Sequence, residues 1–250
     1  MEGLADISIL LVAPKNSGNV GATARAMKNM GLRHLKLVGP CDPLAPESVA
    51  FAVGAVDLLQ QARIFDTFEE AVADQQLVFG TTSKRGRKVR TRLFDVHSAG
   101  ARIRTLGKNQ RVCVAFGPER SGLNEAQLAR CQYLINIPTA PSFPTLNLAQ
   151  SVLIVAYEIF SCAGTDPDEH LDLADQSSLD QMFEQVEATL LKIGFLSTAN
   201  PGHIMRSIRR FLGRADLTPR DVRIVRGIMR QMDWFAREGR HLDPSQVRKP

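Results

Sequence analysis

Residues 111–160 read RVCVAFGPERSGLNEAQLARCQYLINIPTAPSFPTLNLAQSVLIVAYEIF, and the prediction of the fold starts here. The stretch holds a short apolar run at 112–116, a Gly-Pro-Glu-Arg-Ser-Gly loop, and a second apolar run at 133–137. A Pro-rich loop and a strongly apolar helix follow. Strands that end in a Gly- or Pro-rich loop opening a helix are typical of ligand sites in α/β domains. We therefore expect an α/β fold with a binding site at these strand ends.

The alternation of strand and helix extends back to the N-terminus. Residues 7–13 (ISILLVA) form a continuous apolar run, as expected for a strand buried on both faces of a parallel sheet. A Gly-containing loop and a helix at 20–30 follow, with Gly31 as its C-cap. Further strands are expected at 34–39, 62–65 and 77–80, and further helices at 47–61, 68–73, 96–106 and 124–131. This alternation predicts one α/β domain with a largely parallel sheet.

The composition changes after residue 165. Residues 166–180 carry six acidic and no basic residues, which is typical of a linker. Beyond them the pattern is wholly helical, and Ser178-x-x-Gln181 predicts a capping box that opens the first helix. Asn200-Pro201 and Thr218-Pro219 each pair an N-cap with proline at the first helical position. The predicted organisation is a domain at 1–165, an acidic linker at 166–178 and a small helical domain at 179–250.

Basic residues gather in two places in this chain of net charge +5. Six of the nine residues from Lys84 to Arg92 are basic, in a loop just past an expected strand. Arginines also recur at helical spacing in the last two helices, with few acidic residues at i+4 to neutralise them. Apolar residues of the same helices are expected to face a common core, among them Ile204, Phe211, Ile228 and Phe235. Basic surfaces favour polyanions through counterion release, although a solvated charge run remains the alternative.

Several classes of site are disfavoured. The sequence lacks GxGxxG after its first strand, GxxxxGK[ST] and GxSxG, which argues against a dinucleotide site, a P-loop and a nucleophile elbow. Cys41, Cys113, Cys131 and Cys162 form no CxxC motif and the histidines are scattered, so no metal is expected. No apolar run approaches the roughly 18 residues of a membrane helix. The acidic N-terminus lacks the basic segment of a signal peptide, so we expect a cytoplasmic protein with no membrane contact.

Three separate motifs remain to be explained. They are Asn16-x-Gly-Asn-Val-Gly-Ala-x-Ala-Arg-Ala-Met27, Phe116-Gly-x-Glu-x-x-Gly-Leu123 and Leu146-Asn-Leu-Ala149. In this order and spacing they resemble the three motifs of the SPOUT-class RNA 2′-O-ribose methyltransferases. The resemblance covers essentially the whole chain. Within the class, it is strongest to the branch that methylates tRNA in the anticodon loop.

The resemblance implies a fold, a cofactor and a reaction. The fold would be a knotted Rossmann-like SPOUT domain, with a mostly parallel sheet and a C-terminal trefoil knot. S-adenosylmethionine would bind within the knot, and the protein would be a homodimer that acts on tRNA. The ribose at position 32 would be methylated, on cytidine, uridine or both. Two alternatives stay open: the same chemistry on ribosomal RNA, and a non-catalytic RNA-binding protein that retains the fold.

The resemblance also implies roles for individual residues. Arg25 matches the family's catalytic arginine, which is contributed to the active site of the partner subunit. Because arginine is almost always protonated, we expect Arg25 to orient the target phosphate and lower the pKa of the ribose hydroxyl, with a base role as a minority option. Glu119 and Asn147 would shape the substrate site. Thr145 stands where the family usually carries serine, and Pro144 beside it stiffens that turn.

The implied site can be listed in three groups. The catalytic group is Arg25, Glu119, Thr145 and Asn147. The cofactor-binding group is Thr81, Thr82, Ser83, Gly117, Ile137, Pro144, Thr145 and Leu146. The RNA-binding group is Asn16, Lys84, Arg85, Arg87, Arg206, Arg210, Arg223, Arg226 and Arg230.

Overall fold

Five apolar runs of the sequence form the buried centre of one parallel sheet. The computed structural model of the chain describes residues 6–39, 41–83, 92–106, 110–162, 172–197, 201–213 and 215–238. The strands are β1 (Ile7–Val12), β2 (His34–Val38), β3 (Arg63–Phe65), β4 (Leu77–Thr81), β5 (Arg92–Asp95), β6 (Val112–Phe116) and β7 (Tyr133–Asn136). Their order is β3-β2-β1-β6-β4-β7-β5, and every neighbouring pair is parallel. The predicted α/β class and parallel sheet are confirmed, whereas the knot stays a prediction.

Helices cover both faces of this sheet. The helices of the first 162 residues are α1 (Ser17–Asn29), α2 (Pro46–Ala52), the 3-10 turn η1 (Val53–Ala55), α3 (Val56–Gln60), α4 (Phe68–Val72), α5 (Val96–Leu106), α6 (Glu125–Ala129) and α7 (Leu148–Ser161). Side chains of α1, α3, α5 and α7 pack into one apolar cluster with alternate residues of the central strands. Side chains of α4 and α6 pack against the opposite face. The five central strands are therefore buried from both sides, which explains their mostly apolar sequences, whereas the edge strands β3 and β5 are largely exposed.

Local chemistry moved some element bounds away from their predicted positions. Helix α1 begins at Ser17 rather than at residue 20, because the Asn16 side chain caps it by accepting a hydrogen bond from the Asn19 backbone. The helix predicted at 47–61 is broken at Val53, whose φ of 51° leaves the helical region. Strand β5 was not predicted. It lies at the edge of the sheet with mostly exposed side chains, so its sequence carries no buried pattern.

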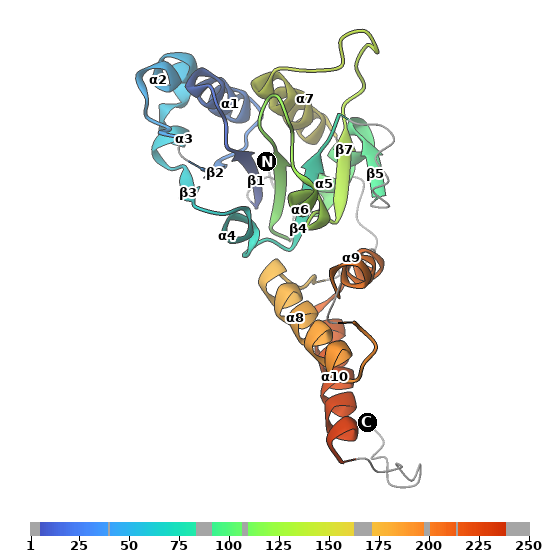
Figure 1. Ribbon diagram of the computed structural model, residues 1–250. Helices are drawn as coiled ribbons and strands as arrows, with labels where there is room; N and C mark the ends of the chain where they lie inside the picture. The colour runs from blue at the N-terminus through green and yellow to red at the C-terminus, as the bar shows by residue number, and fades with distance from the viewer. Residues whose placement is uncertain are drawn as a thin grey trace.

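Three helices form the C-terminal region: α8 (Gln176–Lys192), α9 (Pro201–Leu212) and α10 (Pro219–Glu238). The predicted capping box at Ser178 is wrong: Asp175 caps α8 by accepting a hydrogen bond from the Ser178 backbone, so the helix begins inside the expected linker. The Thr218 cap of α10 is confirmed by its side-chain contact with the Asp221 backbone. Figure 1 shows these helices gathered at one end of the sheet domain, away from the loop that precedes α7.

The core of this region matches its prediction in part. The expected core residues Met182, Phe183 and Val186 of α8 are buried together with Met205 and Met229, and Ile208, Leu212, Val225 and Met232 pack against them as expected. Four residues that were expected in a common core are instead exposed, at 37% for Ile204, 61% for Phe211, 51% for Ile228 and 45% for Phe235. With only three helices, the apolar stripes of α9 and α10 are wider than the surface available to bury them. A large apolar surface therefore stays open on the C-terminal helices.

Candidate functional site

Three loops that are far apart in the sequence meet at the carboxyl ends of β4, β6 and β7. They enclose a cavity of about 410 Å³, whereas two smaller cavities among the described residues measure about 50 and 20 Å³. Only the first is of the size that a small-molecule ligand requires. Its lining residues are Thr81, Thr82, Ser83, Phe116, Gly117, Pro118, Glu119, Arg120, Ser121, Gly122, Leu123, Ile135, Ile137, Thr139, Pro144, Thr145, Leu146, Leu148 and Ser151.

All eight residues of the predicted cofactor-binding group lie in this lining. The loop after β4 is held against its neighbours on both sides. The Thr81 hydroxyl donates to the Ala115 carbonyl of β6 over 3.1 Å, and the Thr82 backbone N–H donates to the Ile135 carbonyl of β7 over 2.9 Å. Sheet pairing therefore fixes the positions of the loops, so the pocket is formed before any ligand arrives.

The loop after β6 folds too tightly to admit a side chain at Gly117. A Cβ atom there would lie 2.1 Å from the carbonyl carbon of Gly122 and 2.2 Å from the backbone nitrogen of Leu123. Gly122 itself has a φ of 66°, in the left-handed region that favours glycine. The two glycines therefore serve the close packing of the loop backbone, which forms one wall of the pocket.

Glu119 and Asn147 belong to one hydrogen-bonded chain that passes through Asn19. The Asn147 side-chain amide donates to Asn19 Oδ1 over 2.9 Å, and the Asn19 amide donates to Glu119 Oε1 over 2.8 Å. The Lys15 backbone N–H lies 3.4 Å from Glu119 Oε2. Asn147 also caps α7 by accepting from the Ala149 and Gln150 backbones. Although sequence reasoning quoted Asn19 within a motif, it gave no role to this residue, which joins the start of α1 to two pocket loops.

The charge of Glu119 is retained at neutral pH. Partial burial acts to raise its pKa, but hydrogen bonds from its own loop backbone, from Asn19 and from the Lys15 and Asn16 backbones outweigh that effect. The net result is a pKa below the ordinary glutamate range. The pocket thus contains a carboxylate that favours a cationic ligand.

Arg25 lies outside the cavity of its own chain. It is exposed on α1 and forms no hydrogen bond or ion pair within the part of the chain that the structure describes. Asn147 likewise stands beside the cavity rather than in its lining, whereas Glu119 and Thr145 line it. Sequence reasoning overlooked Arg120, an exposed basic residue of the pocket lining.

The predicted RNA-binding residues fall into different surroundings. Asn16 caps α1, and Lys84, Arg85 and Arg87 lie outside the described residues. The other predicted RNA-binding residues lie in the C-terminal helical region α8–α10, called the tail below. Of these, Arg206, Arg223 and Arg230 are exposed, and Arg210 and Arg226 are half-buried. Arg226 donates from Nε to Gln185 Oε1 over 3.0 Å. The exposed arginines are therefore the better placed for an external polyanion.

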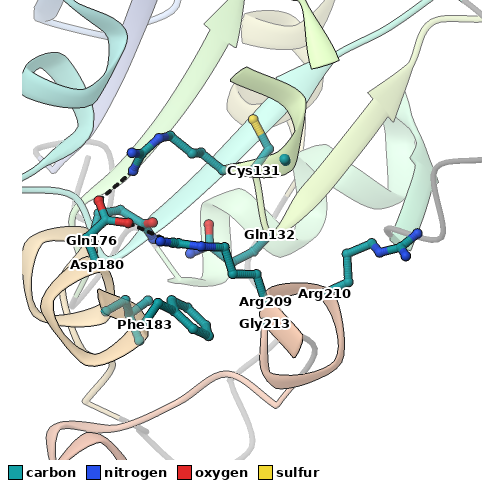
Figure 2. A pocket seen from close by; sticks show the side chains of 11 residues that line it. Cys131, Gln132, Gln176, Asp180, Phe183, Arg209, Arg210 and Gly213 are labelled. Carbon is teal, nitrogen blue, oxygen red and sulfur yellow. Dashed lines mark hydrogen bonds and ion pairs between the residues drawn. The ribbon is translucent and has the colours of Figure 1, made fainter. Parts of the chain in front are cut away.

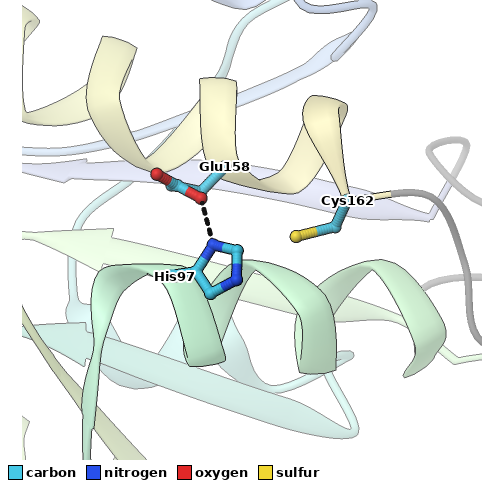
Figure 3. Close-up of side chains that lie close together, drawn as sticks. All are labelled: His97, Glu158 and Cys162. Carbon is cyan, nitrogen blue, oxygen red and sulfur yellow. Dashed lines mark hydrogen bonds and ion pairs between the residues drawn. The ribbon is translucent and has the colours of Figure 1, made fainter.

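One group of possible metal ligands lies away from the pocket, between α5 and α7. Among the described residues, His97, Glu158 and Cys162 bring three possible ligand atoms within 4.8 Å of one another. Figure 3 shows the three side chains facing one another between the two helices. His97 Nδ1 is 2.9 Å from Glu158 Oε2. Burial and the neighbouring Glu158 charge raise the pKa of the Cys162 thiol, so it is a poor metal ligand at neutral pH. The His97–Glu158 hydrogen bond joins α5 to α7 at the protein surface.

None of the described helices is both long and apolar enough to cross a membrane.

The chain is similar to known proteins along nearly its full length. Residues 6–157 match a family model described as the SpoU rRNA Methylase family, and residues 177–244 match one described as the C-terminal domain of tRNA methyltransferase TrmJ. The tRNA (cytidine/uridine/adenosine-2′-O-)-methyltransferase TrmJ of Pseudomonas aeruginosa is 36% identical over 245 residues, covering 92% of this chain and 95% of that protein. The tRNA (cytidine/uridine-2′-O-)-methyltransferase TrmJ of Photorhabdus laumondii is 34% identical over 241 residues, covering 94% of this chain and 100% of that protein.

A solved structure supports the same assignment. The crystal structure of TrmJ from Z. mobilis has a TM-score of 0.80 and 35% sequence identity, and the match covers 92% of this chain and 100% of that one.

Proposed function

The chain belongs to the SpoU methylase family and, within it, to the TrmJ tRNA 2′-O-methyltransferases, and from this premise we propose its methyl donor and its target. The donor is S-adenosylmethionine. The target is the ribose at position 32 of the tRNA anticodon loop, on cytidine, uridine or both, and the reaction takes place in the cytoplasm, where tRNA is found. The observation that carries the proposal is the meeting of three distant loops in one pocket lined by every predicted cofactor residue.

The pocket fits this donor in shape and chemistry. Leu123, Ile135 and Leu148 offer an apolar surface for a purine ring, and several hydroxyls and backbone groups surround it. The ionised Glu119 complements a positively charged sulfonium. When bound, S-adenosylmethionine supplies a methyl group for in-line displacement by a ribose 2′-oxygen. The contribution of the chain is to position the two reactants and exclude water, effects that lower such barriers substantially.

Arg25 acts on the acceptor in this proposal. A guanidinium remains cationic at neutral pH and binds phosphate in a bidentate manner. Arg25 thus orients the phosphate beside the target ribose and, through its positive charge, lowers the pKa of the 2′-hydroxyl. Because Arg25 lies outside the pocket of its own chain, it serves the pocket of a second copy.

The second copy binds on the side of the sheet that α1, α2 and α7 cover. Phe51 on α2 is 54% exposed, and Leu153 and Phe160 on α7 are 40% and 43% exposed. Apolar side chains of this size on neighbouring helices are typical of subunit interfaces. A homodimer formed there would cover them and bring Arg25 of one chain toward the loops of the other.

The proposed domains are a catalytic domain at 1–165 and a helical domain at 179–250, joined by an acidic linker at 166–178 whose last residues already belong to α8. The helical domain supplies tRNA contacts through Arg206, Arg223 and Arg230, which project into solvent. Cationic side chains of this kind hold the phosphate backbone without reading its sequence.

Substitution of Arg25 by alanine tests the central assignment. Methyl transfer to tRNA should fall by roughly 100-fold or more, the size expected when one stabilising donor leaves a transition state. The Kd for S-adenosylmethionine, measured by calorimetry, should stay within about twofold, because Arg25 does not line the pocket of its own chain. Arg33→Ala, a second exposed arginine of the same domain, is the matched control. Lost cofactor binding in the Arg25 variant would show that the residue is misplaced.

The ribosomal RNA alternative rests on the description of the matched family model. Its test is a comparison of tRNA and ribosomal RNA as acceptors for labelled methyl groups. Labelling of ribosomal RNA at rates above those for tRNA would displace the proposed target. Absence of any heat of binding with S-adenosylmethionine would instead favour the non-catalytic alternative.

A further inference from the structure

The C-terminal helices dock on the catalytic domain at the amino end of the sheet. Two backbone hydrogen bonds cross the junction, from Gln176 to the Gln75 carbonyl over 2.9 Å and from Ser177 to the Ala73 carbonyl over 3.1 Å. The Gln76 side-chain amide donates to the Leu173 carbonyl over 2.7 Å. The contact is therefore made by directional bonds at defined positions.

Charged side chains reinforce the junction. Asp180 on α8 accepts from Arg130 of the catalytic domain over 2.5 Å and from Arg209 on α9 over 2.9 Å. The Arg209 guanidinium also lies 4.6 Å from the centre of the Phe183 ring. Figure 2 shows Asp180, Arg209 and Phe183 facing one another at this contact. One carboxylate thus joins a catalytic-domain arginine to a tail arginine.

A second group lies deeper and involves the first residue of β7. The fully buried Tyr133 donates from its hydroxyl to Asp216, in the turn between α9 and α10. Arg102 on α5 donates from Nη2 to the Tyr133 hydroxyl and to Asp216 Oδ2, both over 2.8 Å. Its guanidinium lies 5.0 Å from the centre of the Tyr133 ring. Asp216 has a φ of 47°, so its backbone is held in the left-handed region to reach these partners.

Tyr133 is the hydroxyl donor of this group. Burial and the hydrogen bond to Asp216 raise the pKa of Tyr133 to about 12. The Tyr133 hydroxyl thus keeps its proton at neutral pH and donates it to Asp216.

The position of this group links it to the pocket. Tyr133 begins β7, and the same strand ends at Asn136, directly before the pocket residue Ile137. Four residues of strand span roughly 13 Å. The group therefore touches neither cofactor nor target ribose, but it fixes the tail to the strand that carries a pocket loop.

We propose that Arg102, Tyr133 and Asp216 form an interdomain latch, a set of positioning residues that holds the tRNA-binding helices at a fixed distance from the methyl-transfer pocket. This inference rests on the proposed binding of tRNA by α9 and α10. With the latch intact, a tRNA bound to the tail always presents the same nucleotide to the pocket. With the latch broken, only the contacts at Gln75, Gln76 and Asp180 align the C-terminal helices with the pocket, and part of the advantage of two linked tRNA contacts is lost.

Two conservative variants test the latch. Tyr133→Phe keeps the ring and removes only the hydroxyl, and Asp216→Asn removes the charge while retaining a residue type that tolerates the left-handed region. The KM for tRNA should rise about tenfold in each, as expected for loss of a charged hydrogen bond. The kcat at saturating tRNA and the Kd for S-adenosylmethionine should not change. Asp66→Asn, an exposed aspartate of the catalytic domain, is the matched control.

Further measurements distinguish an effect of the latch from a general loss of stability and from a failure of the proposed function. The Arg102→Asp/Asp216→Arg pair, which reverses the ion pair, should recover a large part of the tRNA KM lost in Arg102→Asp alone. Small-angle scattering should give a larger radius of gyration for Asp216→Asn than for the wild type. An unchanged KM and radius in both conservative variants would overturn the latch, as would a parallel fall of kcat, cofactor affinity and Tm. A wild-type chain that bound no tRNA through its tail would refute the tail's proposed role, while the scattering result would still report whether the contact holds the domains together.

Discussion

The two ends of the parallel sheet present different types of residue. At the carboxyl end the pocket is walled by backbone, glycines, small hydroxyls and apolar side chains, with the Glu119 carboxylate inside it. At the amino end, Arg102, Arg130 and the buried Tyr133 contact aspartates of the C-terminal helical region. The first end depends on shape and close packing, and the second depends on charge. Substitutions at the pocket should therefore act on cofactor binding and turnover, and those at the C-terminal region should act on tRNA affinity.

The largest expected effect belongs to the pocket end. Gly117→Ala would place a Cβ 2.1 Å from the Gly122 carbonyl carbon, so the loop must open. Calorimetry should show the affinity for S-adenosylmethionine weakened by 100-fold or more, about 3 kcal/mol, with a similar loss of turnover. Gly54→Ala is the matched control, because its Cβ would meet nothing within 4 Å. Normal cofactor affinity in Gly117→Ala would show that this loop is not part of the cofactor site. The contrast between the two ends of the sheet would then fail.

The next effect belongs to the C-terminal region. The double variant Arg223→Ala/Arg230→Ala removes two exposed positive charges from one face of α10. The Kd for tRNA should rise about tenfold, and the slope of log K against log salt should become shallower by about two. Filter binding at several salt concentrations measures both. Arg33→Ala serves as the control in the catalytic domain, and an equal change of slope there would mean that the tail has no special role.

A smaller effect follows from the protonation of Glu119. The pKa of Glu119 is lowered in the folded chain. Its negative charge, and the contribution of that charge to folding and to cofactor binding, are therefore present above the ordinary glutamate pKa and are lost only as pH falls through the lowered value. The Kd for S-adenosylmethionine should therefore be constant from about pH 8 to about pH 5, above the ordinary glutamate pKa of about 4.3. Glu119→Gln should weaken binding several-fold over the same range. A Kd that rises steadily between pH 7 and pH 5 in the wild type alone would contradict this protonation state.

Thr145→Ser should give the smallest effect. Thr145 lines the pocket and the substitution keeps its hydroxyl while removing one methyl group. Both kcat and the KM for S-adenosylmethionine should remain within about fivefold, because one methyl group in a pocket is worth about 1 kcal/mol or less. Steady-state kinetics at saturating tRNA are sufficient. A loss as large as that of Gly117→Ala would show that the threonine methyl packs against the reacting groups.

The sequence was informative where burial and capping leave a local pattern. The runs at 7–13 and 112–116 are apolar because both of their faces are covered, and the observed strands fall on them. Residues of the cofactor pocket followed from the motif resemblance, and the structure brings them together. Local pattern could not reveal the bridge through Asn19, because its partners are 100 and 128 positions away. The contact of Tyr133 with Asp216, 83 positions apart, was hidden for the same reason.

Strand β7 contacts the tail at its first residue and the pocket at its end, so its length sets the distance between these two places. Successive side chains of a strand point to opposite faces, so one inserted residue would lengthen β7 by about 3.3 Å and also reverse the direction of every side chain after it. Tyr133 or Ile137 would then leave its place. We therefore expect an insertion between the Tyr133 contact and the pocket to be tolerated in the loops but not among these four residues of β7.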